Sequence, residues 1–296
     1  MNADDARGIV EALTAGTAPP PPAAPTTEDL QRRFPRLDGV TVEAIDVPGP
    51  VGIVDARRYR PRGAPSARLV WVHGGAFIAG DLDMPESHWV ALELAAEGIE
   101  VLSVDYRKAL ADVVYPVPSD DVLAAWRWAV REWGETPHLA GASAGANLTA
   151  GVTARLRDGG EAVPRSLVQV YPLVHQVLPP LSTELREAIA DLPPMFVFES
   201  DAVAVLNDNY CVDPEHAAYA FPGDGPLGGF PPVLVVNAER DSLRASGERF
   251  VRQLRDVGVE VEDLTEPAAM HGYLNEPGDP NAEHTLAVVA DWVARH

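Results

Sequence analysis

The sequence has one cysteine, few basic residues and no long apolar run, and each shortage excludes a class of protein. Cys211 cannot form an internal disulfide, so nothing implies an oxidising compartment. The 23 Lys and Arg residues against 44 Asp and Glu give a net charge of −21, which disfavours nucleic acid and anionic membrane partners. No apolar run approaches a membrane span, and Asp4 and Asp5 stand where a signal peptide has basic residues. We therefore expect a cytoplasmic protein.

The length and composition are those of a globular protein. With 296 residues, 46% hydrophobic and 23% charged, the chain is long enough for one large α/β domain. No motif surrounds Cys211, which is expected to be a small half-buried side chain. No internal repeat and no metal site is predicted.

Strand and helix patterns alternate from residue 40 onward. The predicted strands are 40–47, 52–59, 68–72, 100–105, 137–140, 167–173, 232–237 and 259–264. The predicted helices of this part are 85–96, 119–133, 146–156, 243–257 and 281–295. The first two strands read as an antiparallel pair. This order predicts a mostly parallel sheet with helices on both faces and a site at the carboxyl ends of the strands.

Two segments lie outside this alternation. Residues 1–39 form an arm with short helices at 2–15 and 27–34, the second starting with a Thr cap, joined by a Pro and Ala-rich linker. Residues 175–229 form a long insertion of the kind that makes lids or binding loops. The predicted organisation is arm, core 40–174, cap insertion or lid, and core 230–296. The sequence does not decide whether the arm is a tail or covers a site.

A glycine-rich turn places a serine between a predicted strand and helix. Gly141-Ala142-Ser143-Ala144-Gly145 fits the G-x-S-x-G pattern, in which a strained turn exposes the serine at the edge of the sheet. His73-Gly74-Gly75-Ala76-Phe77 follows the strand 68–72, where glycines can present N–H groups to a tetrahedral oxyanion. These motifs together indicate acyl-transfer chemistry with Ser143 as nucleophile and Gly74, Gly75 and Ala144 as oxyanion donors.

A serine nucleophile needs a base and an acid that orients the base. Asp241 follows the strand 232–237 and His271 follows the strand 259–264, in the order Ser, Asp, His of α/β-hydrolases. His73 is expected to brace the oxyanion loop, and Glu239 to line the turn of Asp241. Ser143, Asp241 and His271 are therefore the predicted catalytic residues.

The whole set of motifs resembles the hormone-sensitive-lipase-like branch of the α/β-hydrolases from about residue 40 to the end. Its residues here are HGGAF, GASAG, Asp105-Tyr106-Arg107, Tyr115-Pro116, Asp120-Asp121, Asp241-Ser242-Leu243-Arg244 and His271-Gly272. The resemblance implies an α/β-hydrolase fold, ester hydrolysis through an acyl-enzyme, no cofactor, and a cap built from N-terminal helices plus an insertion. Two positions depart from that branch, because Ala76 replaces a usual glycine and Ala142 a usual acidic residue or Thr.

The predicted substrate is a neutral, fairly apolar carboxylic ester with a short to medium acyl chain. Residues that could line its pocket are Phe77, Met195, Phe196, Phe198, Tyr210 and Tyr219. The alternatives are acyl transfer, cyclisation, lactone opening or elimination on the same scaffold, and a ligand receptor without catalysis. The sequence leaves open whether the chain forms a homodimer.

Overall fold

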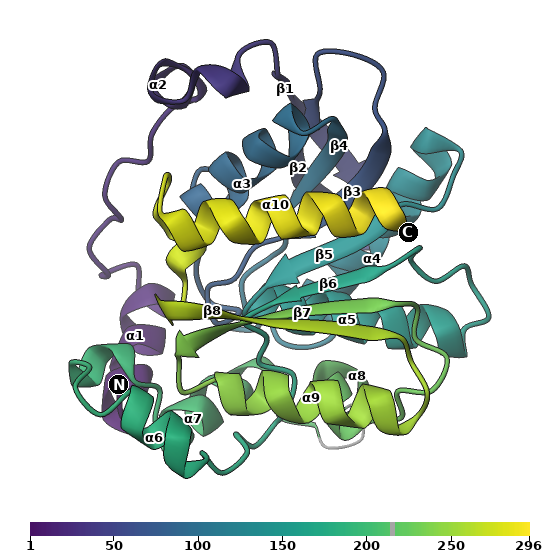
Figure 1. Ribbon diagram of the computed structural model, residues 1–296. Coiled ribbons are helices and arrows are strands. Elements are labelled where there is room, and N and C mark those ends of the chain that lie inside the picture. The colour runs from purple at the N-terminus through teal and green to yellow at the C-terminus, as the bar shows by residue number, and fades with distance from the viewer. Residues whose placement is uncertain (214–216) are drawn as a thin grey trace.

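A sheet of eight strands runs through the middle of the molecule (Figure 1). The computed structural model describes residues 1–213 and 217–296. The strands are β1 (Thr41–Pro48), β2 (Ile53–Arg60), β3 (Ala67–Val72), β4 (Ile99–Asp105), β5 (His138–Ala142), β6 (Leu167–Val170), β7 (Val233–Arg240) and β8 (Val261–Met270). Their order across the sheet is β1-β2-β4-β3-β5-β6-β7-β8. The pair β1–β2 is antiparallel and the sheet is mostly parallel, as predicted. The pair β2–β4 is also antiparallel.

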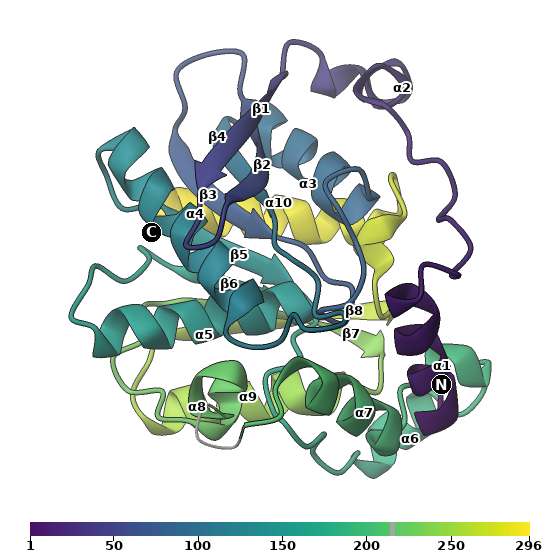
Figure 2. The ribbon, with the colours of Figure 1, turned by 180° about the vertical axis from the view of Figure 1, so that it is seen from behind.

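Helices cover both faces of this sheet (Figures 1 and 2). They are α3 (Pro85–Ala96), α4 (Val117–Trp133), α5 (Ala144–Asp158), α9 (Arg244–Asp256) and α10 (Pro280–Arg295). The first and last of them share one apolar core with the sheet, to which Trp89 and Trp292 belong. The other three pack on the opposite face, where Trp126 and Phe250 are fully buried. Central strands such as β4 are consequently buried along nearly their whole length rather than on alternate residues.

The remaining elements belong to the arm 1–39, to the insertion 175–229 and to the loop after β8. They are α1 (Ala3–Thr14), α2 (Thr27–Arg33), α6 (Thr183–Ala188), α7 (Ser200–Tyr210) and α8 (Ala217–Ala220), with the 3₁₀ turns η1 (Pro35–Leu37), η2 (Pro194–Phe196), η4 (Pro222–Asp224) and η5 (Tyr273–Asn275). Helix α1 packs against α7, and both views show them side by side. The predicted insertion 175–229 thus contains several short helices, and its residues 214–216 lie outside the described residues.

Two of the predicted strand ends are wrong. The strand expected at 167–173 ends at Val170, because Tyr171 has a φ of +36° and Pro172 has no N–H for the ladder. The last strand, β8, continues to Met270, beyond the expected end at residue 264. Its pairing with β7 is irregular between Ala238 and Arg240. Helix α2 starts at Thr27, as predicted, and a threonine, Thr26, caps it.

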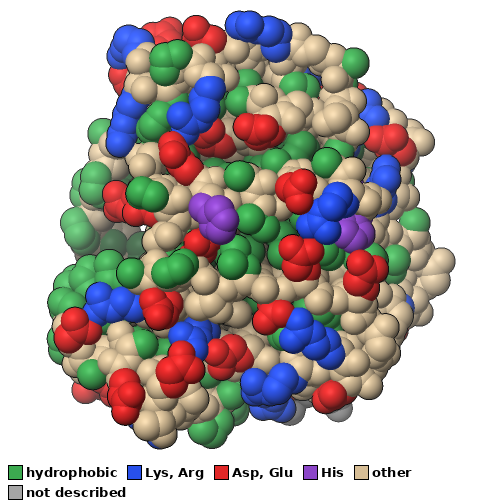
Figure 3. Space-filling model, viewed as in Figure 1, with side chains coloured by type: hydrophobic (Ala, Val, Ile, Leu, Met, Phe, Trp, Pro, Cys, Tyr) green, Lys and Arg blue, Asp and Glu red, His purple; other side chains and the backbone are tan. Residues whose placement is uncertain are grey.

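Charged side chains of both signs are interspersed on the face seen in Figure 3. Many of them pair, and the buried carboxylate of Glu100 lies 2.5 Å from Arg58 and 3.1 Å from Arg68. No helix in the described part of the chain is long and apolar enough to cross a membrane. Within residues 1–213 and 217–296, no cluster of His, Cys, Asp and Glu is arranged to hold a metal ion.

Candidate active site

Ser143 lies on a strained turn between β5 and α5. Its φ of +53° and ψ of −118° are unusual for a residue with a side chain, and such strain is concentrated at functional sites. The turn packs tightly against β3, since a Cβ on Gly145 would lie 2.1 Å from the Val72 carbonyl oxygen. A Cβ on Gly141 would lie 2.5 Å from the backbone of Gly145. The two glycines are therefore needed for the close approach that presents Ser143.

The structure brings the three predicted catalytic side chains together at the carboxyl ends of β5, β7 and β8. Ser143 Oγ lies 2.9 Å from His271 Nε2, and His271 Nδ1 lies 2.7 Å from Asp241 Oδ2. Asp241 is fully buried, and its other oxygen accepts a hydrogen bond of 2.8 Å from the Leu243 N–H. Because a carboxylate only accepts, the proton of neutral His271 belongs on Nδ1, which leaves Nε2 free for the serine proton.

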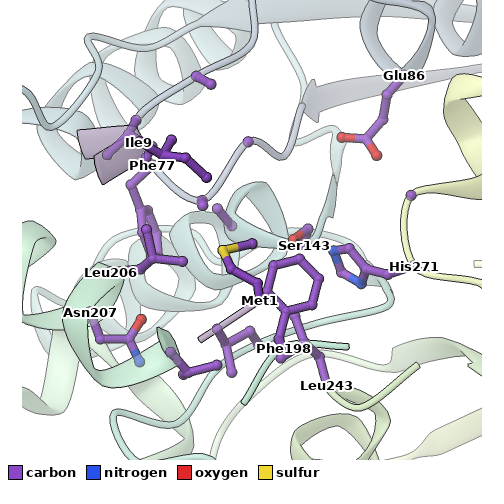
Figure 4. Close-up of a pocket in the computed structure, with 18 of the residues that line it drawn as sticks. Met1, Ile9, Phe77, Glu86, Ser143, Phe198, Leu206, Asn207, Leu243 and His271 are labelled. Atoms are coloured by element: carbon purple, nitrogen blue, oxygen red, sulfur yellow. Dashed lines mark hydrogen bonds between the residues drawn. The ribbon is translucent and has the colours of Figure 1, made fainter. Parts of the chain in front are cut away.

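The surroundings of His271 favour its protonated form. Burial by itself lowers the pKa of His271, but the carboxylate of Asp241, with a smaller contribution from Glu86, more than offsets this and raises the pKa above its ordinary value. The ring packs edge-on against Tyr171 and Phe198, with centroids 4.9 and 5.3 Å away. These contacts hold the imidazole in the orientation that faces Ser143 (Figure 4).

Three other histidines of the described residues, His73, His88 and His138, have hydrogen-bond partners other than Ser143. Burial lowers the pKa of His88 to about 4 and that of His138 to about 4, so both are neutral at pH 7. His73 lies 2.7 Å from the Gly74 carbonyl oxygen through Nδ1 and stacks on Tyr106, with ring centroids 4.7 Å apart. This contact agrees with the predicted bracing of the oxyanion loop.

The position of Gly74 corrects one predicted oxyanion donor. The Gly74 N–H donates to Glu86 Oε1 over 2.5 Å, so it is already occupied. The Gly74 carbonyl oxygen accepts a hydrogen bond of 2.9 Å from the Tyr106 hydroxyl. In a trans peptide the N–H points opposite to the C=O, so this anchor turns the next N–H, that of Gly75, away from Tyr106.

Gly75, Ala76 and Ala144 are the donors that the structure leaves available. All three line the cavity beside Ser143. In the described part of the chain the N–H groups of Gly75 and Ala76 have no hydrogen-bond acceptor. Ala144 is the first residue of α5, where N–H groups lack intrahelical acceptors and favour negative charge. Ala76 was not among the predicted donors, because the prediction took the two glycines that precede it.

The motifs expected to be structural make structural contacts. Asp121 is fully buried and binds the Arg107 guanidinium, with distances of 2.6 and 2.8 Å. Asp120 lies 2.6 Å from Arg155 of α5. Glu239 accepts a hydrogen bond from the Ala268 N–H over 2.6 Å, in the region of the turn where it was predicted.

A cavity of about 300 Å³ opens beside Ser143 and has mainly apolar walls (Figure 4). Of the residues predicted to line a pocket, Phe77 and Phe198 do so. Further lining side chains come from α1, α7 and the loops around them: Met1, Ile9, Ile78, Met84, Leu173, Val203, Leu206, Asn207 and Leu243. None of these side chains was predicted to line the pocket, although the apolar faces of the two helices could have indicated it.

Four residues of the predicted pocket lie elsewhere. Met195 is 70% exposed and Phe196 45% exposed, both in η2 outside the cavity wall. Tyr210 is buried behind the wall and stacks on Phe77 with centroids 3.9 Å apart. The Tyr219 hydroxyl donates to Asp158 over 3.0 Å. The patterns of aromatic residues could not show which side of a short helix faces the serine.

Comparison with known proteins supports what the geometry indicates. A family model described as alpha/beta hydrolase fold matches residues 69–275. The chain is 34% identical to a carboxylesterase named NlhH from Mycobacterium tuberculosis, over 70% of this chain, and it spans 66% of the length of that relative. It is 31% identical to the esterase LipI of the same organism, over 84% of this chain and 80% of the relative.

Solved structures share the architecture. An esterase from Pyrobaculum calidifontis superposes with a TM-score of 0.77 and 28% identity, over 98% of this chain and 93% of that one. The strained serine turn, the sheet order and these matches agree with one another. This chain belongs to the α/β-hydrolase family, in its hormone-sensitive-lipase-like branch.

Proposed function

We propose that this protein hydrolyses carboxylic esters through a serine acyl-enzyme. The observation that carries the proposal is the continuous hydrogen-bonded line from Ser143 through His271 to buried Asp241, at the wall of an apolar cavity. The related proteins named carboxylesterase and esterase support it. A line of this kind makes a serine hydroxyl nucleophilic at neutral pH.

In the proposed reaction each residue has one task. As Ser143 Oγ attacks the ester carbonyl carbon, His271 Nε2 takes the hydroxyl proton and Asp241 stabilises the imidazolium. The negative charge on the former carbonyl oxygen is met by the N–H groups of Gly75, Ala76 and Ala144. His271 then gives its proton to the leaving alkoxide, which departs as an alcohol. A water molecule, deprotonated by the same histidine, attacks the acyl-enzyme, and the acid leaves while Ser143 regains its proton.

The cavity favours a neutral ester with a short to medium acyl chain. Its volume of about 300 Å³ is at the lower end of the range of small-molecule sites, about 300–1,000 Å³. The walls contributed by Phe77, Leu206 and Leu243 are apolar, and the carboxylate of Glu86 also lines the cavity. An acyl group with a negative charge would be repelled there and would lose its hydration.

We further propose that the arm 1–39 and the insertion 175–229 together form a cap over this cavity. Met1 and Ile9 from the arm and Val203 and Leu206 from the insertion stand in its wall. Figure 4 shows Met1 and Phe198 close to Ser143 and His271. In this assignment the arm covers the site rather than hanging free.

The first test is hydrolysis of p-nitrophenyl esters from acetate to dodecanoate by the wild type and by Ser143→Ala. We expect the substitution to lower kcat/KM by a factor on the order of 10⁴ or more, because it removes the nucleophile. Ser103→Ala is a matched control, since Ser103 is also buried and its hydroxyl has no partner among the described residues. It should keep wild-type activity.

The same experiment separates the alternative functions. Absent turnover together with covalent labelling of Ser143 by an organophosphonate would point to acyl transfer, cyclisation or lactone opening. Absent turnover with no labelling would show that the serine is not activated and would favour a receptor. Turnover that survives Ser143→Ala would overturn the proposed mechanism.

A further inference from the structure

A second buried carboxylate, Glu86, stands at the site without a place in the triad. It belongs to the first turn of α3 and is only 2% exposed, and its carboxylate forms part of the cavity wall (Figure 4). Its oxygens accept hydrogen bonds from the Gly74 N–H at 2.5 Å, from the Tyr171 hydroxyl, and from Asn275 Nδ2 at 3.5 Å. Every partner is a donor, which suits an acceptor-only carboxylate and offsets part of the cost of burying it.

Each of these partners belongs to a different loop of the site. Gly74 is in the oxyanion loop after β3, directly before the donor Gly75. Tyr171 follows β6, and its ring packs edge-on against the ring of His271. Asn275 lies in η5 behind His271, and its Nδ2 also donates to the Gly272 carbonyl oxygen over 3.2 Å.

The link to the histidine loop is reinforced through the backbone. The Glu86 N–H donates to Asn275 Oδ1 over 3.2 Å, so this asparagine is held both by the backbone and by the side chain of Glu86. The backbone of Gly74 is held on both sides, through its N–H by Glu86 and through its C=O by Tyr106. One carboxylate thus joins the oxyanion loop to the loop that carries the base.

We propose that Glu86 is a positioning residue that keeps the oxyanion donors and His271 in register with Ser143. The inference rests on the proposed ester hydrolysis. By holding Gly74 it orients the Gly75 N–H, and by holding Tyr171 and Asn275 it orients the imidazole. Its negative charge also favours the imidazolium that forms when Ser143 attacks. The ionisable groups that face His271 are Asp241, Glu86, Ser143 and Tyr171.

The decisive variant is Glu86→Gln, which keeps the size of the side chain and removes its charge. We expect kcat to fall by about 10- to 100-fold, less than the loss of an oxyanion donor itself at about 10²–10³-fold, while KM stays within about threefold. The acidic limb of the pH profile of kcat/KM should move to lower pH, because His271 loses a neighbouring negative charge and deprotonates more readily. Glu86→Asp keeps the charge at a shorter reach, so it should lower kcat and leave that limb in place.

Glu93→Gln is the matched control. Glu93 is a buried carboxylate on the same helix that pairs with Arg36 at 2.8 Å, away from the cavity. Its loss should lower stability without changing kcat per folded molecule or the pH profile. If Glu86→Gln does not fold, Tyr171→Phe is the second variant, because it removes one of the three hydrogen bonds to the Glu86 carboxylate and keeps the aromatic ring. It should lower kcat by a smaller factor and leave KM unchanged.

An NMR titration of His271 tests the inference apart from turnover. The wild-type resonance, assigned by its loss in His271→Gln, should titrate at higher pH than in Glu86→Gln. The positioning role would be overturned if wild type and Glu86→Gln had the same His271 titration and the same kcat. It would also be overturned if Glu86→Gln and Glu93→Gln lost kcat equally. Absent ester turnover with a shifted His271 titration would instead overturn the proposed function and leave the electrostatic link intact.

Discussion

At the scale of single residues, backbone conformation decides how the site is built. Ser143, Ala76 and Phe77 all have positive φ although none is glycine, at +53°, +52° and +66°. Each such residue costs on the order of 1–3 kcal/mol and persists only because the surrounding structure holds it. The anchors of Gly74 on Glu86 and Tyr106 are what hold this loop. In the proposed mechanism, this strain accompanies the aiming of several N–H groups at one oxygen atom.

Gly75 is the residue of the loop that cannot take a side chain. Its φ is +109°, and a Cβ would lie 2.1 Å from the Ala79 carbonyl oxygen. We expect Gly75→Ala to displace the oxyanion loop and to lower kcat by about 10²-fold or more, similar to the loss of a donor. Steady-state kinetics on the best p-nitrophenyl ester measures this loss.

The control for this prediction is Gly63→Ala. An added Cβ at Gly63 meets nothing within 4 Å, and its φ is not in the positive region. This variant should keep wild-type kcat and a similar or slightly higher Tm, since alanine restricts the unfolded chain. Equal activity of the two variants would show that the loop tolerates displacement.

At the scale of elements, the contact between α1 and α7 shapes the cavity. Ala6 of α1 is fully buried in a small apolar cluster with Ile78 of the oxyanion loop and Ala202 and Leu206 of α7. This cluster is separate from the two large cores on the faces of the sheet. Loss of the α1 contact should therefore affect the cavity more than global stability.

Ala6→Arg tests the packing of α1, because the long charged side chain cannot be buried against Leu206 and Ile78. We expect KM for medium-chain esters to rise by about tenfold, with a smaller change for acetate, which needs less of the wall. Tm should fall by a few degrees at most.

Gly8→Arg introduces the same side chain on the exposed side of the same helix, where an added Cβ meets nothing within 4 Å. It should leave KM unchanged across the ester series. If Ala6→Arg also leaves the whole series unchanged, α1 does not form part of the substrate wall.

At the scale of the whole molecule, the net charge of −21 opposes folding through self-repulsion. Ion pairs offset some of this, but most are exposed and contribute about 0–1 kcal/mol each. Glu100 and Asp121 with their arginine partners are buried exceptions. Salt screens both the repulsion between the many unpaired carboxylates and the attraction within the ion pairs. The stability gained from weaker repulsion should exceed the stability lost from weaker pairs.

We expect Tm to rise as NaCl is increased from about 10 mM to about 0.5 M, over which the screening length falls from about 30 Å to less than 8 Å. A gain of about 1 kcal/mol corresponds to roughly 2–4 °C for a large domain. Differential scanning calorimetry at pH 7 measures it. Sucrose at matched osmolality does not screen charge and is the control, and a Tm that falls with NaCl would show that attractive pairs dominate.

The sequence by itself determined the fold class and the catalytic candidates, because their signals are local. Strand and helix periodicity, the glycines around Ser143, and the positions of Asp241 and His271 after strands are properties of short segments. They predicted the sheet and the three residues that the structure brings together. Errors arose where the outcome depends on the geometry of one loop, as for Gly74, whose N–H points to Glu86.

Only the tertiary structure decided which side chains surround the serine and how its loops are joined. Met195 and Tyr219 looked like pocket residues but face elsewhere, while Leu206 lines the wall. Glu86 reaches Asn275 across 189 positions of sequence. No periodicity or motif encodes a contact of that kind, because it exists only when separate loops meet at one edge of the sheet.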